Sequence, residues 1–72
     1  MKIYEHPYFD HADGLDIMIM LDPSEDELEV YYRMPGSPFI YAFGLLIWQN
    51  SMSEVIEIAK CNAKDYAEVL FG

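Results

Sequence analysis

The sequence predicts an α+β fold in which a small antiparallel β-meander, with three to four strands, packs against one long C-terminal α-helix. Apolar residues recur with helical spacing over residues 52–71, whereas they alternate with polar residues over 15–21 and 28–34. Clusters of turn-forming residues separate these segments. Because 53% of the 72 residues are hydrophobic, we expect a single folded domain over residues 1–72 rather than a disordered chain.

The C-terminal segment has the clearest helical pattern. Its apolar residues follow the i, i+3, i+4, i+7 spacing of one helix face, at Met52, Val55, Ile56, Ala59, Ala63, Tyr66, Ala67 and Leu70. Ser51 and Glu54 have the spacing of a capping box, so we expect the helix to begin directly after Ser51. Gly72 is the expected C-terminal cap.

Residues 15–21 and 28–34 are expected to be two strands of a hairpin joined by the polar turn 22–27. One face of this hairpin is apolar and comprises Leu15, Ile17, Ile19, Leu21, Leu28, Val30, Tyr32 and Met34. The other face comprises Asp16, Met18, Met20, Asp22, Glu27, Glu29, Tyr31 and Arg33. One helix covers only one face of a sheet. The helix should therefore cover the apolar face and leave the second one open.

Two further strands are predicted at the ends of this hairpin. Residues 39–43 follow a Pro-Gly turn, and residues 2–9 carry β-type side chains, with Pro7 restricting them to the edge of the sheet. The Asp13-Gly14 pair is a turn signal that leads into the first hairpin strand. Residues 45–50 are compatible with either a short helical turn or an irregular connection.

The charge balance restricts the classes of partner. The chain has 13 acidic residues against four Lys and Arg, a net charge of −9, and nine of the acids lie within residues 1–33. Phosphate groups would be repelled, so direct binding to nucleic acid and to anionic membranes is not expected. The one cysteine, Cys61, excludes an internal disulfide, and the apolar run 39–48 is shorter than the ~20 residues of a membrane span. With no signal peptide at the N-terminus, we expect a cytoplasmic protein.

Catalytic or cofactor-binding motifs are not found in the sequence. It has no glycine-rich phosphate loop and no nucleophile elbow, so we expect a protein that is not an enzyme and has no cofactor. The one set of metal-ligand residue types is His6, Asp10, His11, Asp13 and Asp16, and the spacing of its two histidines matches no zinc pattern. A metal-dependent enzyme using His6, Asp10 and His11 is the alternative from a different functional class.

The segregation of charge instead favours a surface that binds another protein. Residues 34–53 carry no charge and are rich in aromatic residues, and they directly follow the acidic hairpin. The candidate acidic binding residues are Asp16, Asp22, Glu25, Asp26, Glu27 and Glu29. The candidate apolar binding or dimer residues are Met18, Met20, Tyr31, Tyr41 and Phe43. Alternation would place Tyr41 and Phe43 on the same face of their strand.

The sharpest functional hypothesis is an inhibitor that occupies the basic, nucleic-acid-binding surface of a partner protein. Glu27 and Glu29 would lie about 6.6 Å apart on one strand face and form a short row of negative charge. Small phage counter-defence proteins of the anti-CRISPR or anti-restriction type act as DNA mimics in this way, in the cytoplasm of the host cell. The alternative is a small regulatory or adaptor subunit that forms a homodimer and whose acidity serves only solubility.

Overall fold

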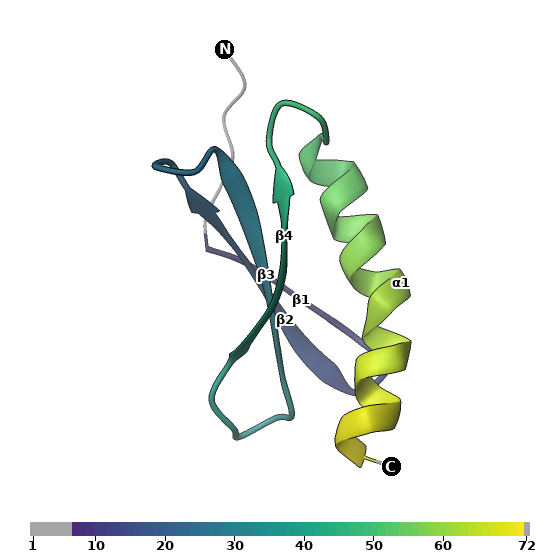
Figure 1. The fold of residues 1–72 in the computed structure, drawn as a ribbon. Coiled ribbons are helices and arrows are strands. Elements are labelled where there is room, and N and C mark those ends of the chain that lie inside the picture. The colour runs from purple at the N-terminus through teal and green to yellow at the C-terminus, as the bar shows by residue number, and fades with distance from the viewer. Residues whose placement is uncertain (1–6, 72) are drawn as a thin grey trace.

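The computed structural model describes residues 7–71, which form four strands and one helix (Figure 1). The elements are β1 (Tyr8–Ala12), β2 (Leu15–Asp22), β3 (Glu27–Arg33), β4 (Ile40–Leu46) and α1 (Met52–Phe71). The strands form one antiparallel sheet in the order β1-β2-β3-β4. The helix α1 runs along one face of this twisted sheet. The predicted α+β fold, with its meander and C-terminal helix, is confirmed.

The core lies between α1 and the alternating apolar residues of the two central strands. Its fully buried members are Leu15, Ile17 and Ile19 from β2, Leu28, Val30 and Tyr32 from β3, and Val55, Ala59 and Ala63 from α1. The small side chains of Ala59 and Ala63 let the helix approach the sheet closely, so that the larger β2 and β3 side chains fill the space between the two layers. The helical and strand patterns in the sequence therefore identified the two faces that meet.

Specific hydrogen bonds fix the start and the middle of α1. The Glu54 amide donates to Ser51 Oγ at 3.2 Å, and the Ser51 amide donates to Glu54 Oε1 at 2.9 Å, which confirms the capping box. The buried Tyr32 hydroxyl of β3 donates to the main-chain carbonyl of Ala59. The Tyr32 ring also stacks on Tyr66, with centroids 4.7 Å apart. The expected C-terminal cap, Gly72, lies outside the described residues.

The first strand differs from its predicted position. We expected a strand over residues 2–9, but β1 spans Tyr8–Ala12, and residues 2–6 lie outside the described residues. Asp13 and Gly14 both have positive φ, 51° and 81°, which makes a two-residue turn and places Ala12 opposite Leu15. The pairing of β1 with β2 therefore begins at this turn, so β1 continues past Phe9 to Ala12.

The last strand is longer than predicted and contains a bulge. It spans Ile40–Leu46 instead of 39–43, and residues 47–50 form a turn. Phe43 pairs with Val30 while Tyr41 pairs with Tyr31, so Ala42 is an extra residue that reverses the alternation. The expectation that Tyr41 and Phe43 share a face was wrong. Phe43 lies on the helix side and packs against Tyr32, with ring centroids 6.4 Å apart.

Candidate protein-binding face

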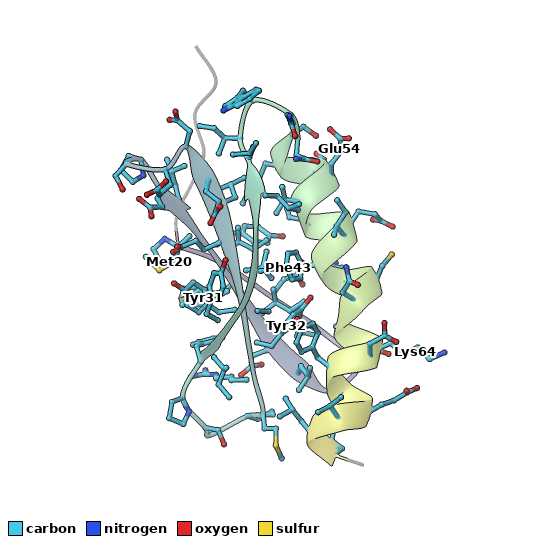
Figure 2. All side chains as sticks on the ribbon, in the orientation of Figure 1. Met20, Tyr31, Tyr32, Phe43, Glu54 and Lys64 are labelled. Atoms are coloured by element: carbon cyan, nitrogen blue, oxygen red, sulfur yellow. The ribbon has the colours of Figure 1, made fainter. Side chains whose placement is uncertain are left out.

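The side of the sheet opposite α1 carries a mixture of acidic, aromatic and methionine side chains, and we call it the open face. Figure 2 shows Met20 and Tyr31 pointing away from α1, whereas Tyr32 and Phe43 lie between the sheet and the helix. The strand register places the following residues on the open face: Phe9, His11, Asp16, Met18, Met20, Asp22, Glu27, Glu29, Tyr31, Arg33, Tyr41 and Leu46. All eight hairpin residues predicted for this side lie there.

Negative charge gathers at the end of the open face near the β2–β3 turn. Asp22 and Glu27 are direct cross-strand partners, and Glu25 and Asp26 are exposed in the turn between them. Asp22 Oδ1 accepts hydrogen bonds from the amide and the hydroxyl of Ser24, at 3.0 and 2.7 Å. Within residues 7–71, neither Asp22 nor Glu27 forms an ion pair. Like charges placed opposite each other destabilise a sheet. The fold thus retains an uncompensated acidic end.

Two carboxylates and two tyrosines come together beside this acidic end, and we call Glu27, Glu29, Tyr31 and Tyr41 the carboxylate–tyrosine cluster. The Tyr31 hydroxyl donates to Glu29 Oε1 at 2.9 Å. The Tyr31 and Tyr41 rings meet edge to face, with centroids 5.7 Å apart. The Glu27 side chain lies over Gly44, where a Cβ would collide with it.

The carboxylates of this cluster change the pKa values of its two tyrosines. The hydrogen bond to Glu29 is the largest cause of the raised pKa of Tyr31. Desolvation raises the pKa of Tyr41, and the nearby charges of Glu27 and Glu29 raise it further. Both glutamates therefore lie close enough to Tyr41 to act on the same hydroxyl group.

The opposite end of the open face is neutralised and aromatic. Arg33 Nε donates to Asp16 Oδ2 at 2.9 Å, and the Arg33 guanidinium carbon lies 4.3 Å above the Phe39 ring. Phe9 contacts Phe39 with centroids 6.2 Å apart and is 59% exposed. A cavity of about 320 Å³ opens there, lined by Phe9, Asp10, His11, Asp16, Ile17, Arg33 and Phe39. This end therefore offers an apolar contact with few free charges.

The structure separates the predicted binding residues into four groups. Asp22, Glu25, Asp26, Glu27 and Glu29 share the acidic end, and Met18, Met20, Tyr31 and Tyr41 lie on the same face. Asp16 lies at the other end in an ion pair, and Phe43 belongs to the helix side.

Phe9 was not among the candidate binding residues, and Phe39 was included only as one of the aromatic residues of the uncharged stretch 34–53. A signal for Phe39 was present, because it is a large apolar residue directly after the turn 35–38, whereas Phe9 lies within β1. Only the tertiary pairing of β1 with β2 brings them together.

The residues considered for a metal site do not converge. Asp10 and His11 are consecutive in β1 and so point to opposite sides of the strand. His6 lies outside the described residues. Among residues 7–71 no three His, Cys, Asp or Glu side chains are grouped so that they could hold a metal ion. Cys61 is an exposed free thiol on α1.

Asp10 instead connects β1 to the helix. Its Oδ2 accepts from the Tyr8 hydroxyl at 3.0 Å and pairs with Lys60 Nζ of α1 at 3.1 Å, and its Oδ1 accepts from the His11 amide at 2.8 Å. Burial by itself would raise the pKa of the Asp10 carboxyl group, but the hydrogen bonds from the His11 amide and Lys60 outweigh it and lower the pKa. The role of Asp10 in the structure is thus to hold two elements together.

In the part of the chain that the structure describes, no helix combines the length and the apolar character needed to cross a lipid bilayer. No protein-family model, no curated protein and no solved structure matches this chain.

Proposed function

We propose that the protein is a non-enzymatic module that binds a basic surface of another protein through its open face. The observation that carries this proposal is the acidic end of an uncovered sheet face, where Asp22 and Glu27 have no ion-pair partner among residues 7–71. Two of the four basic residues, Arg33 and Lys60, are already engaged in ion pairs with Asp16 and Asp10. A partner's lysine and arginine side chains would supply the missing positive charge.

A basic surface that normally holds nucleic acid is the partner that fits best. Glu27 and Glu29 are alternate residues on one strand face, where the backbone repeats about every 6.6 Å, and the turn residues Glu25 and Asp26 extend the negative charge. Grooves built from lysine and arginine neutralise phosphates chiefly by charge. They would therefore also accept such a row. In its finest form the proposal is an inhibitor of phage counter-defence type, acting in the host cytoplasm on a CRISPR or restriction protein.

Affinity capture with matched bait proteins tests this function. The bait is the wild-type chain, the charge-reversed variant Glu27→Lys/Glu29→Lys, or the control variant Glu57→Lys/Glu68→Lys, which makes the same change in charge on the exposed side of α1. We expect wild type and control to retain a nucleic-acid-handling protein from host lysate, and the charge-reversed bait to lose it. Duplex DNA and rising salt should both release the bound partner.

Binding of the purified partner then gives the quantitative result. The affinity should fall steeply with salt concentration and drop at least tenfold in the charge-reversed variant, because close charge pairs across interfaces are worth about 1.5 kcal/mol or more. Salt-insensitive binding that survives charge reversal would show that the acidic end is not the binding surface.

A dimeric adaptor is the second candidate, and one observation favours it. The edge strand β4 carries no charge, and its residues Ile40 and Tyr41 are 61% and 52% exposed. Pairing of two β4 edges would cover them. Sedimentation equilibrium should then show a dimer that dissociates when Ile40 is changed to Lys. A monomer at every concentration tested would leave only the first candidate.

A further inference from the structure

We propose that the open face recognises arginine side chains specifically, and that a partner's guanidinium group docks on the carboxylate–tyrosine cluster of Glu27, Glu29, Tyr31 and Tyr41. This site rests on the proposed function, because both use the open face, but it names the chemistry of the partner. The occupant is an arginine-bearing segment of a basic protein.

The cluster offers an aromatic ring and a carboxylate side by side, and a guanidinium group can contact both at once better than an ammonium group can. Tyr41 is half-exposed and meets Tyr31 edge to face, so an aromatic surface is open to a planar cation. The Tyr31 hydroxyl donates to Glu29 Oε1 and so holds this carboxylate in place on the open face. A guanidinium group stacks on a ring and donates to a carboxylate at once, whereas a lysine ammonium group is a compact, strongly hydrated point charge.

Glu27 adds a second carboxylate because Gly44 leaves room for it. The Glu27 side chain lies where a Cβ at position 44 would be, so it folds over β4 on the side of Tyr41. Desolvation and the charges of Glu27 and Glu29 together raise the pKa of Tyr41. Charge complementarity therefore favours a cation above Tyr41.

The protein already binds one guanidinium group of its own in this manner on the same face. Arg33 lies between a carboxylate and a ring, with Nε 2.9 Å from Asp16 Oδ2 and the guanidinium carbon 4.3 Å from the Phe39 centroid. Arg33 and Tyr31 are two residues apart on β3, so the two places are neighbours on one surface. The carboxylate–tyrosine cluster repeats this arrangement, but within residues 7–71 no basic side chain pairs with it.

Binding of two fluorescent peptides tests the site. Nona-arginine and nona-lysine carry the same charge, so at one ionic strength their affinities separate guanidinium recognition from charge alone. The variants are Tyr41→Leu, which removes the ring, and Tyr41→Phe, which retains it. Because Tyr41 is half-exposed, both variants should fold, and circular dichroism checks this. Glu29→Gln and the exposed control Glu57→Gln complete the set.

We expect nona-arginine to bind wild type about fivefold more tightly than nona-lysine, the size of one exposed cation–π contact. Tyr41→Leu should remove this preference by weakening nona-arginine binding more than nona-lysine binding, whereas Tyr41→Phe should retain it. Glu29→Gln should weaken nona-arginine more than Glu57→Gln does.

Two results would overturn the arginine site, and they differ from the result that overturns the proposed function. Equal affinity for both peptides, or a preference that survives in Tyr41→Leu, excludes guanidinium recognition at this cluster. If both peptides still bind and lose affinity in Glu27→Lys/Glu29→Lys, the acidic binding face stands. If neither peptide distinguishes wild type from that charge-reversed variant, both proposals fail.

Discussion

The side chain of Glu27 lies across Gly44 of the neighbouring strand, in the space that a Cβ at position 44 would occupy. The strand register places Gly44 opposite Glu29, so two acidic side chains of β3 meet at one residue without a side chain. Glycine weakens the interior of a strand because it adds no packing. Here it provides room for a carboxylate on the open face instead.

A thermodynamic cycle on this pair should show strong coupling. Gly44→Ala forces the Glu27 side chain to move, so we expect it to lower the free energy of unfolding when Glu27 is present. In a Glu27→Ala background the same change should be neutral or slightly stabilising, because alanine loses less backbone entropy than glycine. The coupling measured by urea denaturation should be about 1 kcal/mol. Additive effects of the two substitutions would mean that Glu27 does not rest on Gly44.

The sequence identified those elements whose pattern is long or repeated. α1 begins and ends at the predicted residues because 20 residues keep one apolar stripe and because Ser51 and Glu54 define its start. β2 and β3 were predicted to within one residue, since strict alternation fixes which side chains face the core. That same alternation correctly placed the acidic residues of the hairpin on the face away from the helix.

The edge strands could not be predicted equally well, because tertiary contacts define them. Asp10 faces the helix side of β1, where an alternating pattern calls for an apolar residue, and the contacts of its carboxylate, among them the ion pair with Lys60 of a distant element, make this position favourable. The extra residue Ala42 reverses the alternation of β4. No local feature of the segment indicates this bulge. The candidate site therefore gained Phe9 and Phe39 and lost Phe43 once the fold was known.

Tyr32 should be a major contributor to stability through its hydroxyl group as well as its ring. The hydroxyl is buried and donates to the Ala59 carbonyl of α1, so Tyr32→Phe should cost about 1 kcal/mol. Tyr32→Ala should cost about 3–5 kcal/mol, because it also removes the ring that stacks on Tyr66. Urea denaturation measures both. Tyr31→Phe is the matched control on the open face and should cost less than Tyr32→Phe, since its hydroxyl partner is only partly buried.

The Asp10–Lys60 ion pair should make stability depend on pH at both extremes. The folded state lowers the pKa of Asp10 below its ordinary 3.8. The contribution of the Asp10 carboxylate to the free energy of unfolding is therefore complete above pH 3.8 and is lost as the pH falls through the folded-state pKa. The folded state raises the pKa of Lys60 above 10.5, so that contribution is present below pH 10.5 and is lost at higher pH.

Asp10→Asn tests this dependence. At pH 7 the variant should be less stable than wild type, and the difference should shrink as the pH falls below 3.8, because the unfolded wild type takes up a proton on Asp10 at a higher pH than the folded protein does. Asp65→Asn, at an exposed position of α1, should show no such narrowing. Chemical denaturation at pH 7 and pH 2.5 gives the free energies of unfolding of wild type and of each variant, which are four values for each comparison. A constant difference between Asp10→Asn and wild type would mean that the ion pair adds nothing to folding.

Arg33 should contribute to the free energy of unfolding through two contacts that respond differently to salt. Its ion pair with Asp16 is about one-third exposed on both sides, so the coupling between these residues should be about 0.5 kcal/mol and should weaken as salt is added. Its contact with the Phe39 ring should couple by about 0.5–1 kcal/mol and change little with salt. Double-mutant cycles with Asp16→Asn and Phe39→Leu, each combined with Arg33→Gln, separate the two.

Arg33→Lys provides the conservative comparison for these cycles. Lysine keeps the positive charge but lacks the planar group that stacks on Phe39. The variant should therefore retain the salt-dependent coupling to Asp16 and lose the coupling to Phe39. The same separation of charge from stacking distinguishes the two peptides at Tyr41. If Arg33→Lys retains the coupling to Phe39, a ring on the open face does not favour guanidinium over ammonium, and this result would count against arginine recognition there.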